Sequence, residues 1–315
     1  MTMLLAACST DIDMEQTTMG NATVTERIPI SLNASPIHVE TSADTRAASD
    51  AFNSNIIAVW CLPVSELGTT SSTAIDMTSA NIIPMANVQA TLPTADSGSN
   101  TLIFTTNQSS DTENTTTNTY DYLYPEITTS GTNYRYAFFA YQPVAEEKQI
   151  EKTDSDVVIT YSLDGTNNIL WSSASNTDAY AYSEAYWQRT PNASSPELAT
   201  FKHTMAAVTV KVTATDTDDT QAPKIASISL NNMPASGKLS LLNGTMTVAG
   251  TETTTYTYNV AETSTTAEAT FYVIPTSDSL SITVNYQDSE TNPSVTKTTT
   301  ATALTAGTEY TINAN

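Results

Sequence analysis

Short runs in which β-branched or aromatic residues alternate with polar residues recur along almost the whole chain. In one of them, Val208, Val210 and Val212 alternate with Thr209 and Lys211. This period of two places the apolar side chains on one face of a strand. Turn-forming residues separate the runs at intervals of roughly 8–20 residues, which is typical of antiparallel sandwiches. The pattern predicts an all-β protein.

Two runs stand out because they are apolar on both faces, as expected for central strands of a sandwich. They are residues 56–62 (IIAVWCL) and residues 134–141 (YRYAFFAY). An earlier run places Val24, Ile28, Ile30 and Leu32 on one face, with Glu26 as the exception on that face. Further strands are predicted at residues 87–92, 101–105, 157–163, 169–171, 225–230, 239–242, 256–260, 271–274, 280–286 and 310–312.

The length of 315 residues favours two domains, each large enough to bury a core. Residues 1–21 are interpreted as a truncated signal peptide, lipobox and tether. Residues 22–198 are predicted to form an N-terminal β-sandwich with a removable first strand, and residues 199–315 a C-terminal β-sandwich. Pro191 and Pro196 are interpreted as marks of a linker between the two.

The net charge of -22 comes from 33 acidic residues against 11 lysines and arginines. Such a chain repels phosphate backbones, which argues against nucleic-acid binding. It also disfavours electrostatic attachment to anionic lipid. The charge suits a solvated surface in an extracellular place.

Motifs for catalysis are missing from the sequence. The two histidines, His38 and His203, show no zinc-binding spacing, and there is no glycine-rich phosphate loop or nucleophile elbow. Asp216, Asp218 and Asp219 lack the glycine and the final glutamate of a calcium loop. Cys61 lies within the apolar run 56–62 and is expected to pack as a small hydrophobe. We therefore expect no catalytic centre, metal or cofactor.

The N-terminus contains Leu5-Ala6-Ala7-Cys8, an aliphatic residue and two small residues before a cysteine. This pattern is that of a bacterial lipobox, in which the cysteine thiol receives a lipid that anchors the protein. A basic region and a full apolar stretch, which a signal peptide has, are lacking ahead of it. Whether the true start lies upstream of Met1 stays open.

An aromatic cluster occupies residues 180–187 and includes Tyr182, Tyr186 and Trp187. Aromatic rings of this kind stack on sugars, or pack between domains, which is the commoner use. These three residues are the candidate glycan contacts of the chain.

Several segments, in order along the chain, resemble the fimbrillin family, the type V pilins of Gram-negative bacteria. After the lipobox at Cys8 come residues 44–47 (DTRA) and 136–143 (YAFFAYQP). They are followed by residues 201–210 (FKHTMAAVTV), 271–275 (FYVIP) and 304–312 (LTAGTEYTI). The resemblance implies two antiparallel, Greek-key (transthyretin-like) β-sandwich domains.

The resemblance also implies a mechanism of assembly. A precursor is exported as a lipoprotein and held at the outer membrane by the lipid on Cys8. An Arg-specific protease then cuts the Arg46–Ala47 bond, and Arg46 is the only Lys or Arg between Arg27 and Arg135. The strand at residues 22–33 leaves, and a strand from another pilin subunit replaces it by β-augmentation. The implied location is the cell surface, in a pilus that supports adhesion.

Alternative functions stay open at this stage. The chain ends soon after the strand at residues 310–312, so a tip subunit or an uncut basal anchor is an alternative to a stalk subunit. A lipid-anchored adhesin or glycan-binding protein that does not polymerise is a second alternative. A surface hydrolase that uses carboxylates is a third.

Overall fold

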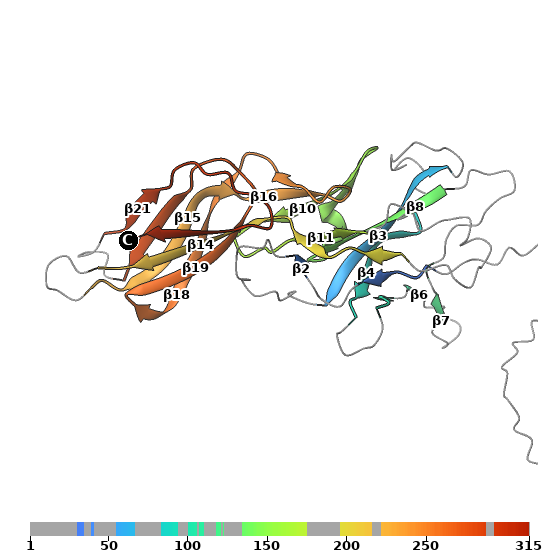
Figure 1. The fold of residues 1–315 in the computed structure, drawn as a ribbon, viewed down its shortest axis with the longest axis horizontal. Helices are drawn as coiled ribbons and strands as arrows, with labels where there is room; N and C mark the ends of the chain where they lie inside the picture. Colours follow the sequence, from blue (N-terminus) through green and yellow to red (C-terminus); the bar gives the residue numbers. More distant parts are fainter. Residues whose placement is uncertain are drawn as a thin grey trace, which may run out of the picture.

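The computed structural model describes residues 30–34, 39–40, 55–66, 83–93, 100–105, 107–109, 118–120, 122, 134–174, 196–215, 222–287 and 293–314. Within them the chain is built of strands, apart from one 3-10 turn, η2 (Glu147–Gln149). The molecule is elongated, with the N-terminal strands at one end and the C-terminal strands at the other (Figure 1). The prediction of an all-β sandwich protein is confirmed; the Greek-key connections stay a prediction.

A seven-stranded sheet forms the N-terminal half, in the order β2-β13-β11-β8-β3-β4-β5. Its centre is the antiparallel pair β3 and β8, whose register runs from Ala58 opposite Tyr141 to Glu66 opposite Tyr134. The strands are β2 (Val39–Glu40), β3 (Ile56–Glu66), β4 (Met85–Thr91), β5 (Ile103–Phe104), β8 (Tyr134–Gln142), β11 (Leu170–Ser173) and β13 (Phe201–His203).

Both faces of the β3–β8 pair are buried, as the two apolar runs predict. On one face, residues such as Trp60 and Phe139 join a core that continues into the C-terminal half. On the other face, residues such as Cys61 and Phe138 join a second core that belongs to the N-terminal half. The central pair is therefore the wall between two cores.

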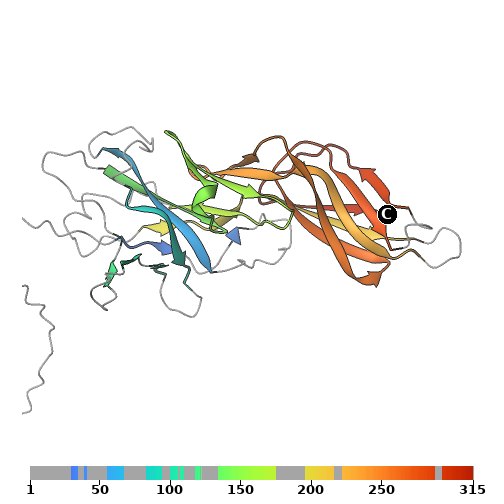
Figure 2. The same ribbon diagram turned by 180° about the vertical axis from the view of Figure 1, so that it is seen from behind.

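A four-stranded sheet with the order β17-β16-β10-β9 joins strands from both sides of residue 199. It comprises β9 (Ile150–Lys152), β10 (Val157–Ser162), β16 (Ser236–Ser240) and β17 (Met246–Val248). The pairing of β10 with β16 spans five residue pairs, from Val158 opposite Ser240 to Ser162 opposite Ser236. Figure 2 shows these strands between the two ends of the molecule.

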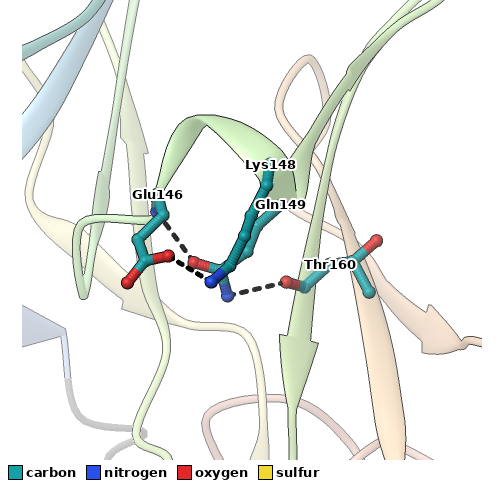
Figure 3. Close-up of polar contacts among 4 residues, drawn as sticks. All are labelled: Glu146, Lys148, Gln149 and Thr160. Carbon is teal, nitrogen blue, oxygen red and sulfur yellow. Dashed lines mark hydrogen bonds and ion pairs between the residues drawn. The ribbon is translucent and has the colours of Figure 1, made fainter.

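The turn η2 leads the chain from β8 into this four-stranded sheet (Figure 3). The Gln149 side chain accepts a hydrogen bond from the Glu146 backbone N–H at 2.7 Å and donates one to the Thr160 carbonyl at 3.2 Å. Lys148 Nζ lies 2.6 Å from Glu146 Oε2, and this contact lowers the pKa of the Glu146 carboxyl. The Gln149 side chain thus both caps the turn and fastens it to β10.

The C-terminal half is a sandwich of a three-stranded sheet, β19-β14-β22, and a four-stranded sheet, β18-β15-β20-β21. The strands are β14 (Ala206–Thr213), β15 (Ile225–Pro234), β18 (Thr253–Ser264), β19 (Thr266–Val273), β20 (Ser281–Tyr286), β21 (Val295–Thr298) and β22 (Glu309–Ala314). Two small pairs complete the described strands: β1 (Asn33–Ala34) with β12 (Glu197–Leu198), and β6 (Asn107–Ser109) with β7 (Asn118–Tyr120). Most pairs are antiparallel, but β1–β12, β2–β13 and β14–β22 are parallel.

The strand predicted at residues 239–242 ends earlier, because β16 stops at Ser240 and a turn follows. Gly244 adopts a φ of 71° and its N–H donates to the Ser240 carbonyl at 3.0 Å. The Asn243 side chain accepts a hydrogen bond from the Thr245 N–H at 2.9 Å. An Asx turn followed by a left-handed glycine stops the strand.

This turn packs on Trp171 of β11 and so connects the two halves. The indole Nε1–H of Trp171 donates to the Leu241 carbonyl at 2.7 Å. A Cβ added at Gly244 would lie 2.6 Å from atoms of the Trp171 ring. The contact therefore requires a residue without a side chain at position 244.

We expect Gly244→Ala to lower the free energy of unfolding by about 2–4 kcal/mol, because it adds overpacking to a strained positive φ. The matched control is Gly250→Ala, where φ is 76° but nothing lies within 4 Å of the added Cβ. The control substitution should lower the free energy of unfolding by only about 1 kcal/mol. Denaturant unfolding measures both, and equal losses would contradict tight packing of the turn on Trp171.

Candidate functional site

The most N-terminal described segment, residues 30–34, lies between two other parts of the chain. On one side, Asn33 N–H donates to the Pro196 carbonyl at 2.8 Å, and β1 runs parallel to β12. On the other side, Leu102 N–H donates to the Leu32 carbonyl at 2.9 Å, and Ala34 N–H to the Asn100 carbonyl at 2.8 Å. The segment is thus held as an inner strand, with partners along both edges.

The same segment fills part of the N-terminal core. Ile30, Leu32 and Ala34 are buried, with Leu32 at 0% exposure, while Ser31 and Asn33 between them are half-buried. The three apolar side chains belong to the core that contains Cys61 and Phe138. We call the position occupied by residues 30–34 the N-terminal strand site.

A second contact follows a few residues later along the chain. Val39 and Glu40 form β2, which pairs in parallel with Phe201 and Lys202 of β13 at the end of the seven-stranded sheet. Both pairings join a segment before residue 46 to a segment after residue 195. The N-terminal segment is therefore secured by long-range contacts.

The chemistry of the site is that of strand recognition. Most of its polar contacts are made by backbone N–H and C=O groups, and its buried side chains are apolar. The Asn33 side chain accepts a hydrogen bond from the Thr101 hydroxyl at 3.2 Å. Cys61 is a free, fully buried thiol, and burial raises its pKa well above the ordinary value, so it stays a thiol at neutral pH. His203 ends β13, with Nδ1 2.7 Å from Asn168 Oδ1.

The strand predicted at residues 22–33 therefore corresponds, in its described part, to a buried segment that reaches Ala34. Its partners were not recognised from the sequence. Pro196, which was interpreted as part of a linker, is buried and accepts a hydrogen bond from this segment. The carbonyl of Tyr122 likewise accepts a hydrogen bond from Ile30 N–H, at 2.7 Å.

Other residues singled out in the sequence lie outside the described residues. They are Cys8, His38, Arg46, Ala47, Tyr182, Tyr186, Trp187, Asp216, Asp218 and Asp219. Within the described ranges, no three His, Cys, Asp or Glu side chains are grouped so as to hold a metal. No helix in that part of the chain is long and apolar enough to cross a membrane.

One known structure has a similar fold. A candidate cell adhesion protein from Bacteroides ovatus is 15% identical, with a TM-score of 0.52, covering 91% of this chain and 92% of that one. One from Bacteroides uniformis is 13% identical, with a TM-score of 0.48 and 93% of each chain covered. The fimbrial anchor protein Mfa2 of Porphyromonas gingivalis is 11% identical, with a TM-score of 0.33, covering 87% of this chain and 82% of that one.

No curated protein gives a significant match to the chain. The sequence model of the fimbrillin-like family, in contrast, matches residues 45–315, which is most of the chain. The resemblance that the ordered motifs indicate is therefore confirmed, and the chain belongs to the fimbrillin-like family.

Proposed function

We propose that this protein is a structural subunit of a bacterial surface fimbria that supports adhesion. Membership of the fimbrillin-like family supports a surface fimbrial role. The similar fold of a candidate cell adhesion protein agrees with it. The subunit is made as a lipoprotein, held at the outer membrane through Cys8, and polymerises when a strand of one subunit replaces the N-terminal strand of another.

The observation that carries this proposal is the N-terminal strand site. Residues 30–34 and 39–40 precede Arg46 in the chain, whereas β3 and all later strands follow it. One cut after Arg46 would therefore separate β1 and β2 from the rest of the protein. The match to the family model begins at residue 45, beside the proposed cut, so the part common to the family starts where the released piece ends.

Loss of the segment would leave a strand position ready for another strand. The carbonyls of Tyr122, Asn100 and Pro196 would lose their donors, and the N–H of Leu102 would lose its acceptor. The apolar walls around Leu32 would become exposed to water. Unpaired backbone edges beside an apolar face are the features to which an incoming strand adds. In the family resemblance that strand comes from the C-terminal part of the next subunit.

We expect an Arg-specific protease to convert the full chain into a species that begins at Ala47 and forms a ladder of oligomers. Arg46→Lys should block this cut and keep the protein monomeric, because the protease reads the guanidinium. Trypsin accepts lysine, so it should cut the same variant and restore the ladder. N-terminal sequencing and native gels measure both steps, and a cleaved protein that remains monomeric at high concentration would contradict assembly by strand replacement.

We expect Leu32→Ala to lower the free energy of unfolding of the uncut protein by about 3 kcal/mol, because it leaves a cavity at a fully buried site. Ser31→Ala, on the other face of the same segment, is the matched control and should change little. After cleavage the N-terminal strand site no longer contains Leu32, so the Leu32→Ala and wild-type proteins should form the same ladder by strand replacement. A difference that persists in the cleaved proteins would argue against removal of this strand.

A further inference from the structure

The two sheets of the C-terminal sandwich have unequal numbers of strands. The sheet β18-β15-β20-β21 has four strands, and the facing sheet β19-β14-β22 has three. At the unequal edge, β21 ends one sheet and β22 ends the other. One strand position next to β22 is therefore vacant in the described part of the chain.

The register shows that the inner face of β21 is the uncovered surface. Ile282 of β20 lies opposite Lys297, and Val284 lies opposite Val295. Directly opposite residues share a face of the sheet. Ile282 and Val284 are buried in the core, so Lys297 and Val295 point to the same inner side, yet both are exposed, with Val295 at 41%.

The facing strand β22 is uncovered in the same way. Its inner residues Tyr310 and Ile312 lie beside the buried Val208 and Val210 of β14, but they are only half-buried. A groove of about 520 Å³ runs between β22 and β20–β21. Its walls are apolar at Leu280, Ile282, Leu304 and Ile312, and threonines form much of the rest. We call it the C-terminal slot.

The slot suits one extended strand better than a second folded domain. An incoming strand would pair with the free edge of β22 and cover Val295 and Lys297 of β21. Because β21 is the end strand of the facing sheet, the added strand would lie over its inner face. The loop before β22 lines the slot at Thr302 and Leu304. This loop is held by the Tyr310 hydroxyl, which donates to the Ala303 carbonyl and accepts from Thr305 N–H.

The positive charge of Lys297 indicates which residues a strand bound in the slot should carry. Lys297 is the positively charged residue among those that line the slot. In the described part of the chain, ion pairs are formed by Lys148, Lys211 and Lys238. Asp278, which also lines the slot, accepts a hydrogen bond from Thr276. A complementary strand therefore needs alternating apolar residues and a carboxylate on the same face.

Residues 22–33 of this chain have that pattern. Val24, Ile28, Ile30 and Leu32 share one face, and Glu26 is the charged exception on it. Pro29 lies between Ile28 and Ile30, so its backbone nitrogen points to the opposite edge of the strand from theirs. When the N–H groups of Ile28 and Ile30 point toward β22, the N–H that Pro29 lacks would point away from β22. The segment can thus pair along one edge without losing a hydrogen bond there.

We infer that the C-terminal slot binds residues 22–33 of a second copy of the chain, with Glu26 against Lys297. The inference rests on the proposed function for one step, because cleavage after Arg46 supplies the free segment. The released strand would then connect its lipid-bearing piece to a neighbouring subunit. The slot itself needs no cleavage, which allows the binding to be tested separately.

The test uses a synthetic peptide of residues 22–33 and the uncut full chain, whose N-terminal strand site is occupied by its own residues 30–34. The peptide should slow hydrogen exchange of the β22 amides. Lys297→Glu should weaken peptide binding about fivefold in calorimetry, as expected for a partly exposed ion pair. A peptide carrying Glu26→Lys should bind Lys297→Glu better than it binds the wild-type protein.

Lys224→Glu is the matched control, since it makes the same charge change at an exposed lysine outside the slot and should leave binding unchanged. Failure of the peptide to protect β22, or equal affinities for all four charge combinations, would overturn the inference. Neither result would affect assembly after cleavage. Conversely, a cleaved protein that stays monomeric would overturn the proposed assembly and leave the peptide result standing.

Discussion

The fold depends on one strand pair that is buried on both faces. Trp60 and Phe139 face the core shared with the C-terminal half, while Cys61 and Phe138 face the N-terminal core. A strand pair in this position has no solvent-exposed face, so each face must be covered by another layer. The larger core is covered by strands from both halves of the chain. Within the described residues, the N-terminal segment, Leu198 and Tyr122 are part of the cover of the smaller core.

Burial in the smaller core makes the N-terminal segment important for the stability of the folded chain. Burial of Ile30 and Leu32 is worth about 2 kcal/mol each, and each backbone hydrogen bond of the segment adds about 1 kcal/mol. The whole stability of a domain is only about 5–15 kcal/mol. A protein that loses the segment would therefore lose a large share of its stability, and in the proposed assembly another strand in the same position would restore it. This balance would couple removal of the segment to its replacement.

The sequence predicted the elements better than their partners. The β3 and β8 strands were recognisable because runs that are apolar on both faces suit only an interior position. The burial of Ile30 and Leu32 on one face followed from alternation. The pairing of that segment with Pro196 and Asn100 could not be predicted, because contacts between residues this far apart in the sequence leave no local pattern. The end of β16 was missed because Leu241 and Leu242 extend the apolar run into a turn that Asn243 and Gly244 impose.

The two strand positions differ in how they can be opened. Leu32 is fully buried in the N-terminal strand site, so exchange there without a cut must first expose an apolar core, and proteolysis removes that barrier. The C-terminal slot is already open, because Ile312 and Val295 are partly exposed at its rim. The folded chain therefore keeps the slot empty at little cost in free energy. A tightly filled position suits a single irreversible step, whereas an open one suits reversible binding. In the two proposals, the same chain would thus bind strands in two ways, one at a position opened by cleavage and one at a position that is already open.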